Sequence, residues 1–147
     1  MPYKITYDAT PEISGTSFLW QGISDYAHEM KNQTPGKSFA FFIKDELSNL
    51  KGGIFGYIFY DCLYVDLLYI DKSLRGMKYG TRLMNEAELL AIKNNCHFMT
   101  VNTMDWEAPE FYKKLGFYVE FERKGYAKNS TFYFLRKNLD VSSGVKS

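Results

Sequence analysis

The residues best suited to chemistry form a glycine-containing turn, Arg75-Gly76-Met77-Lys78-Tyr79-Gly80. A hydrophobic run over residues 67–70 precedes the turn, and a helical pattern follows it. A turn from a strand into a helix leaves backbone N–H groups unpaired at the positive end of the helix dipole, where a phosphate can bind. The sequence therefore predicts either a phosphate-binding turn or an ordinary turn. Walker and dinucleotide loops are excluded, because Gly-Lys-Ser/Thr and Gly-x-Gly-x-x-Gly are both missing here.

A second candidate is Tyr112, on a short predicted helix over residues 109–115 that Gly116 ends. Phe111 and Leu115 are four residues apart and are expected to form the buried stripe of this helix. Tyr112 is rotated by about 100° from Phe111, so it can point elsewhere, for example into a cleft. The alternative is that Tyr112 is a half-buried packing residue.

Alternating strand and helix signals position these two segments. The predicted strands are residues 3–7, 38–43, 54–60, 63–70, 97–103, 117–123 and 131–137, and the predicted helices are about 17–30, 79–94 and 109–115. One hairpin is expected to turn at Asp61-Cys62. This order indicates an α+β fold, a mixed sheet with helices packed on it. We expect a single domain over residues 1–140 and a disordered tail over residues 141–147.

The two segments are more informative together. The strand, the Arg-x-x-x-x-Gly turn and the helix are followed about thirty residues later by Ala108-Pro109-Glu110-Phe111-Tyr112-Lys113-Lys114-Leu115-Gly116-Phe117. This combination resembles the GNAT acyltransferase superfamily over roughly residues 52–139, and the wording of residues 65–71 resembles a small bacterial branch of it. The resemblance implies a three-layer α+β fold, with a central, mostly antiparallel mixed sheet flanked by helices. It also implies direct acetyl transfer from acetyl-CoA to a primary amine of a small molecule or peptide.

The same resemblance implies where the co-substrate acetyl-CoA binds. Backbone N–H groups of the turn would bind the pyrophosphate, and main-chain groups near Leu68 and Ile70 would pair with pantetheine and polarise the thioester carbonyl. Asn102 and Thr103 would lie beside the cofactor, and Tyr112 would be the general acid that protonates the leaving thiolate. The expected cofactor-binding residues are Leu68, Tyr69, Ile70, Arg75, Gly76, Met77, Lys78, Tyr79, Gly80, Thr81, Asn102 and Thr103.

Amide formation also needs a base, since a lysine-like amine with a pKa of about 10.4 is almost fully protonated at pH 7. Asp66 is the candidate, because strand alternation puts it on the same face as Leu68 and Ile70. The alternative is a carboxylate that pairs with an arginine or caps a turn. Glu107 and Asp105 are rivals, and neither of the two histidines has a catalytic context.

Two positions depart from the family pattern that the resemblance supplies. In Arg/Gln-x-x-Gly-x-Gly/Ala, the middle glycine is replaced by Lys78. If that position needs a left-handed backbone, lysine costs about 1 kcal/mol, which its ammonium can offset by meeting a phosphate. Asp105 stands where the family usually has asparagine, so no asparagine contact is predicted there.

The composition excludes several other classes. The net charge of +1 favours neither nucleic acid nor an anionic membrane as a partner. No apolar run approaches the roughly 18 residues of a membrane span, and the first residues do not resemble a signal peptide. Cys62 and Cys96 lack metal-ligand spacing, so no metal is expected and both should be reduced thiols in the cytoplasm.

Two other functions stay open at this point. One is a non-catalytic CoA-binding or regulatory module of the same fold, which Lys78 and the uncertain base suggest. The other is a partner-binding domain, including a homodimer, that uses the aromatic side chains of Phe18, Trp20 and Tyr26. By resemblance, the acceptor site is expected near residues 14–36 and 125–131.

Overall fold

The computed structural model describes residues 2–139, and the chain divides into two compact units between Pro35 and Gly36. The first unit holds helix α1 (Ile13–Lys31), which starts four residues before the predicted helix at about residue 17 and otherwise confirms it. Asn32 ends α1 in a left-handed conformation with φ of 53°, and its N–H donates to the carbonyl of His28 at 2.8 Å.

The strand predicted over residues 3–7 is wrong, because no regular structure is present between residues 2 and 12. Tyr3, Ile5 and Tyr7 alternate as in a strand, yet all three are exposed. Alternation reports only that one face of a strand can be apolar. A strand also needs a hydrogen-bonded neighbour, and the strands of the described sheet all come from residues 37–138.

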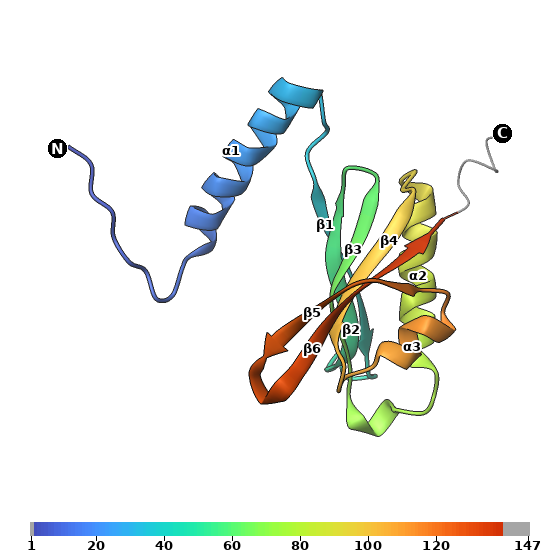
Figure 1. Ribbon diagram of the computed structural model, residues 1–147. Helices are drawn as coiled ribbons and strands as arrows, with labels where there is room; N and C mark the ends of the chain where they lie inside the picture. The colour runs from blue at the N-terminus through green and yellow to red at the C-terminus, as the bar shows by residue number, and fades with distance from the viewer. Residues whose placement is uncertain (1, 140–147) are drawn as a thin grey trace. The chain divides into compact units, whose positions relative to one another are not determined.

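The second unit is built on a six-stranded sheet in the order β1-β2-β3-β4-β6-β5 (Figure 1). Its strands are β1 (Lys37–Lys44), β2 (Leu50–Phe59), β3 (Cys62–Ile70), β4 (Phe98–Met104), β5 (Tyr118–Tyr126) and β6 (Ser130–Asn138). The only parallel pair among these strands is β3 with β4, and the other four pairs are antiparallel. The predicted mixed, mostly antiparallel sheet is therefore confirmed.

Helices α2 (Tyr79–Lys93) and α3 (Pro109–Lys114) lie on one face of this sheet (Figure 1). The core between them joins Leu83 and Ala87 of α2 and Tyr112 of α3 to the buried strand residues Leu63 and Met99. Short 3-10 turns, η1 (Lys72–Leu74) and η2 (Ala127–Asn129), complete the connections. The turn from β3 into α2 and the loop from β4 into α3 follow adjacent parallel strands, so both leave the sheet at the same end.

Strand ends differ from prediction where turn chemistry sets them. The β2–β3 hairpin turns at Tyr60-Asp61, with φ of 48° and 66°, one residue earlier than expected. Two consecutive positive φ values are the signature of a type I′ turn, which matches the twist of a hairpin. Strand β2 also starts at Leu50 instead of residue 54, because its glycines pair directly with β1 and β3.

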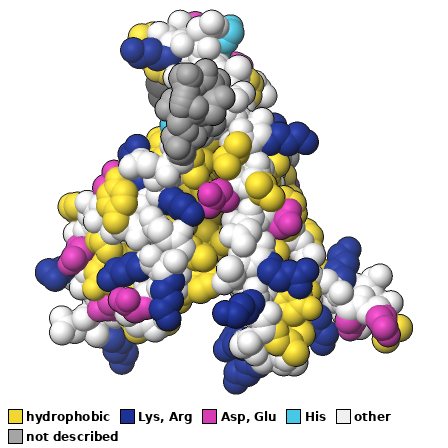
Figure 2. Space-filling model, turned by 90° about the vertical axis from the view of Figure 1, so that its right-hand side faces the viewer, with side chains coloured by type: hydrophobic (Ala, Val, Ile, Leu, Met, Phe, Trp, Pro, Cys, Tyr) yellow, Lys and Arg dark blue, Asp and Glu magenta, His cyan; other side chains and the backbone are white. Residues whose placement is uncertain are grey.

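Both signs of charge are present on the face of the molecule drawn in Figure 2. On the face drawn in Figure 2, Lys and Arg side chains are spread over the lower half with hydrophobic side chains between them, and Asp and Glu side chains lie among them. Across residues 2–139, no helix is both long and apolar enough to cross a membrane.

Candidate functional site

The site begins where the central parallel strands separate. Strands β3 and β4 pair from Cys62–Phe98 to Val65–Val101, and their pairing stops there. Beyond that point β3 continues to Ile70 while remaining paired with β2 on its other side. The edge of β3 that faces β4 is therefore left open, and an extended ligand can add to such an edge by main-chain hydrogen bonds.

Asp66 occupies a bulge at the start of this open segment. Phe55 of β2 pairs with Leu67 and Gly56 pairs with Val65, so Asp66 is the extra residue on β3. The bulge changes the alternation: Val65 is buried and Leu68 packs on the same core, whereas Asp66 and Leu67 are exposed.

The expectation that Asp66 shares a face with Leu68 and Ile70 is therefore wrong, because strict alternation does not survive a bulge. Asp66 instead lies beside Tyr64. Burial raises the pKa of the Tyr64 phenol, and the charge of Asp66 and its hydrogen bond with that phenol raise the pKa further. The carboxylate consequently lies on the face of the sheet opposite α2, at the point where the strands part.

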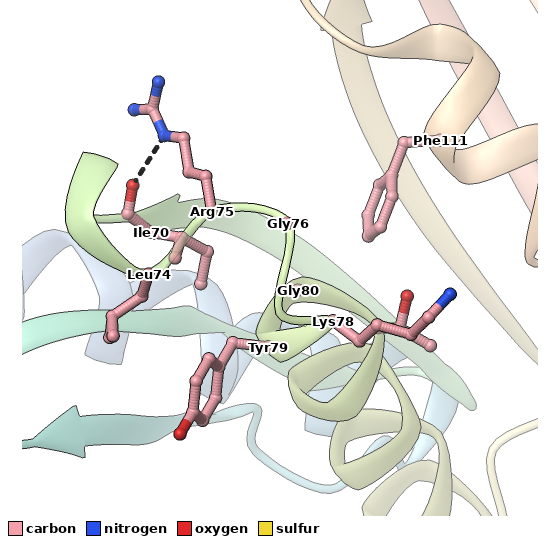
Figure 3. A pocket seen from close by; sticks show the side chains of 9 residues that line it. Ile70, Leu74, Arg75, Gly76, Lys78, Tyr79, Gly80 and Phe111 are labelled. Carbon is pink, nitrogen blue, oxygen red and sulfur yellow. Dashed lines mark hydrogen bonds between the residues drawn. The ribbon is translucent and has the colours of Figure 1, made fainter.

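The turn after β3, drawn in Figure 3 with the side chains around it, presents a run of backbone N–H groups without hydrogen-bond partners in the described chain. The N–H of Arg75 bonds to the carbonyl of Lys72, and the N–H of Arg82 is the first to bond within α2, to the carbonyl of Lys78 at 3.0 Å. Within the described chain, the six backbone N–H groups of residues 76–81 make no hydrogen bond. The first turn of α2 also has no side-chain cap. This arrangement is suited to several phosphate oxygens.

All of these residues except Met77 line a pocket of about 320 Å³. Its walls are Ile70, Leu74, Arg75, Gly76, Lys78, Tyr79, Gly80, Thr81 and Phe111. Seven of these nine residues are among the predicted cofactor-binding residues, and only Leu74 and Phe111 were not predicted. Figure 3 shows the Phe111 ring facing the turn, and a Cβ on Gly80 would lie 3.2 Å from its Cζ. Gly80 therefore leaves room for this ring beside the helix start.

Arg75 holds the turn against the end of β3. Its Nε donates to the carbonyl of Ile70 at 3.1 Å (Figure 3), and its guanidinium lies 5.7 Å from the centre of the Tyr69 ring. The first contact closes the turn, and the second is a cation–π contact. Arg75 therefore fixes the shape of the pocket as well as contributing positive charge to it.

Lys78 has the left-handed backbone that the family pattern assigns to glycine, with φ of 67° and ψ of 20°. Gly76 also has positive φ, at 82°. A side chain in this region costs about 1–2 kcal/mol relative to glycine. Lys78 is exposed and lines the pocket, so its ammonium is available to a bound anion.

We expect Lys78→Gly to raise the free energy of unfolding by about 0.5–1 kcal/mol, because glycine relieves the left-handed strain but is more flexible when unfolded. Acetyl-CoA affinity should stay similar, since glycine lets the backbone approach the phosphate more closely, which offsets the lost charge. Urea unfolding and calorimetry measure the two effects. Lys78→Ala is the matched control: it loses the charge, keeps the strain, and should bind several-fold more weakly. A Lys78→Gly protein that is less stable than wild type would contradict this account.

Tyr112 is the most buried residue of α3, with 7% of its surface exposed, while Phe111 and Leu115 are half-buried against the core. The predicted stripe is present, but Tyr112 faces inward more completely than either member. Burial, and secondarily the charge of Glu107, raise the pKa of Tyr112 to about 12. The phenol is therefore protonated throughout the physiological range, as a proton donor must be.

Glu107 stabilises the loop between β4 and α3, the helix that carries Tyr112. Its Oε1 accepts from the N–H of Met104 at 2.7 Å and from the hydroxyl of Thr103 at 3.3 Å. Thr103 is itself only 3% exposed, and its hydroxyl also accepts from the N–H of Ala108. Glu107 and Thr103 therefore hold the loop before α3, and the structure places the Thr103 hydroxyl inside the fold. Asp105, the other rival base, is exposed, and its N–H donates to the carbonyl of Thr131.

The remaining residues predicted to bind the cofactor lie in different environments. Leu68 packs against the core, Tyr69 and Met77 are exposed, and Asn102 lies on the sheet face opposite α2. The Nδ2 of Asn102 donates to the hydroxyl of Tyr64 at 3.5 Å. Sequence reasoning missed Tyr64, although its place two residues before Asp66 was a usable signal. Phe111 was predicted only as a packing residue.

Comparison with known proteins identifies the family. Residues 3–117 match the sequence profile of the acetyltransferase (GNAT) family, and the chain belongs to this family of N-acetyltransferases. It is 33% identical over 106 residues to the blasticidin-S acetyltransferase of Streptomyces morookaense, an alignment that covers 71% of this chain and 78% of that protein.

Solved structures agree on the fold. An acetyltransferase from Bacillus cereus superimposes with a TM-score of 0.74 at 23% identity, covering 91% of this chain and 98% of the other. The PaiA N-acetyltransferase of Thermoplasma acidophilum, solved in complex with coenzyme A, gives a TM-score of 0.59 at 19% identity and covers 89% and 81%. The α+β fold class expected from the resemblance is thus confirmed.

Proposed function

We propose that this acetyltransferase uses acetyl-CoA to acetylate a primary amine of a small molecule. The observation that carries the proposal is the run of unpaired N–H groups at residues 76–81, directly after the open edge of β3. The donors suit the pyrophosphate and the open strand edge suits the pantetheine arm. The Streptomyces relative, named for blasticidin S, supports a small-molecule acceptor.

Acetyl-CoA supplies the acetyl group as a thioester. In the proposed reaction, the amine nitrogen bonds to the acetyl carbon as the carbon–sulfur bond breaks. Asp66 takes the proton that the amine loses, directly or through a water. Tyr112 gives its proton to the leaving sulfur, and its raised pKa keeps that proton in place until the thiolate forms. The open main-chain groups of β3 near Leu68 polarise the carbonyl oxygen.

A thiol-release assay tests the proposal. Wild-type protein with acetyl-CoA should release free CoA in the presence of at least one amine from a panel of blasticidin S, amino acids, aminoglycosides, polyamines and short peptides. Release should saturate with both substrates, and mass spectrometry should find an added acetyl group on the amine. Calorimetry that shows CoA binding without release for any amine would favour the non-catalytic alternative. Release only with peptides would replace the small-molecule acceptor.

We also retain a homodimer and a cytoplasmic location as proposals. Phe18, Ile23 and Tyr26 of α1 have exposed side chains, and an apolar surface on a helix is a common site of association. Cys62 and Cys96 are free, buried thiols, which suit a reducing compartment.

A further inference from the structure

A second pocket, of about 310 Å³, opens on the sheet face opposite α2. Its aromatic lining comes from Phe59, Tyr64 and Phe134. Its polar lining comes from Thr100, Asn102 and Glu120. The volume is at the lower end of small-ligand sites, and apolar walls with a few fixed polar groups are typical of such sites.

The pocket adjoins the proposed base through Tyr64. Asn102 donates to the hydroxyl of Tyr64 at 3.5 Å, and Asp66 lies two residues along β3, close enough for its charge to raise the pKa of the Tyr64 phenol. The last pair between β3 and β4 is Val65–Val101. Tyr64 comes directly before Val65 and Asn102 directly after Val101, so both lie where the two strands part. A ligand in this pocket therefore ends beside Asp66, at the opening in the sheet.

Charge in and around the pocket favours one positive group on the ligand. Glu120 is the charged residue of the lining, and Asp66 lies beyond Tyr64. Arg136 contacts Oε2 of Glu120 at 3.4 Å, but its Nε donates to Asn138 at 2.7 Å and its guanidinium lies 3.8 Å from the centre of the Phe98 ring. Within residues 2–139, Oε1 of Glu120 has no ion-pair or hydrogen-bond partner.

The two nearby arginines limit the ligand further. The guanidinium of Arg123 lies 5.0 Å from the centre of the Phe134 ring, and Arg136 is held beside Glu120. Like charges placed at a rim oppose a ligand that carries several positive charges. The aromatic walls favour an apolar body next to the ammonium.

We infer that this pocket binds the acceptor, a small monocationic amine with an apolar or aromatic body, with Glu120 holding its ammonium and Tyr64 and Asn102 positioning it beside Asp66. The inference rests on the proposed acetyl transfer and names the acceptor class for it. It places the acceptor on residues of β3, β4, β5 and β6 instead of the segments 14–36 and 125–131 that the resemblance implied.

Binding can be measured without turnover. Phenethylamine, a monocationic aromatic amine, is titrated into CoA-saturated wild-type protein and followed by NMR. The side-chain amide of Asn102 should shift, and Glu120→Gln should raise the Kd at least fivefold. Glu122→Gln is the matched control: it removes a carboxylate from the same strand, outside the pocket. Equal weakening by both variants, or shifts that avoid Asn102, would overturn the inference.

Turnover then separates this inference from the proposed function. With the amine that wild type acetylates fastest, Glu120→Gln and Tyr64→Phe should raise the KM for the amine at least fivefold and leave the KM for acetyl-CoA unchanged. An unchanged amine KM in both variants would refute the pocket while acetyl transfer stands. Phenethylamine binding at Asn102 without any thiol release would refute acetyl transfer while the amine pocket stands.

Discussion

Tyr112→Phe should lower kcat by at least about tenfold while acetyl-CoA affinity stays within about twofold. In the proposed reaction, removal of the hydroxyl takes away the proton that Tyr112 gives to the leaving sulfur. The ring itself remains, with its edge contacts to Phe111 and Phe117 at 5.0 and 5.9 Å between centroids. Steady-state kinetics and calorimetry on the same preparation measure the two quantities.

The pH dependence of the wild-type rate gives a second test of Tyr112. Because the pKa of Tyr112 is about 12, its ionisation should add no fall in wild-type rate below about pH 10. Tyr118→Phe is the control, since Tyr118 is an exposed residue of β5 outside both pockets. If Tyr112→Phe keeps full turnover, the proton comes from another group and Tyr112 is a packing residue.

Gly56→Ala should cost at least about 3 kcal/mol of stability, because overpacking between paired backbones cannot relax locally. A Cβ at Gly56 would overlap the carbonyl oxygen of Tyr64 and lie 2.9 Å from Cε1 of Phe39. Gly56 is also the β2 partner of Val65, next to the bulge that holds Asp66. Urea unfolding of the variant should therefore show a much lower midpoint.

Gly76→Ala is the control for Gly56→Ala: it also replaces a glycine by alanine, but without a steric clash. The Gly76 Cα faces open space but has φ of 82°, so alanine there should cost only about 1–2 kcal/mol. Equal midpoints for Gly56→Ala and Gly76→Ala would contradict the steric argument.

Much of the second unit could be predicted because its signals are local. The helical pattern of α2, the glycine after α3 and the strand runs are each contained in a few neighbouring residues. The strand at residues 3–7 failed because its existence depends on a partner, which no local pattern reveals. The bulge at Asp66 was missed for the same reason: it is a mismatch between two strands, and β3 alone does not encode it.

In the candidate site, too, features with a local sequence signal could be predicted, and features that depend on several strands could not. The turn proposed to bind phosphate could be located from the sequence because Arg75, Gly76 and Gly80 are close together in it. Its Lys78 has the left-handed backbone that the pattern required. The second pocket could not be found in this way. Glu120, Tyr64 and Asn102 are far apart in the sequence. They line one pocket because β3, β4, β6 and β5 lie side by side in this order in the sheet.

The short pairing of β3 with β4 has a mechanical consequence. The ladder between the half-sheets β1-β2-β3 and β4-β6-β5 pairs residues 62–65 with residues 98–101, and the N–H of His97 adds one bond to the carbonyl of Asp61 at 2.7 Å. The turn of residues 75–80 follows the first half and Tyr112 follows the second, so a small rotation about this seam changes the distance between the proposed cofactor turn and the proposed acid. Leu63 and Met99 are paired across the seam and fully buried under α2. In the proposed reaction their packing would therefore set the alignment of the two halves, although neither side chain lines either of the two described pockets.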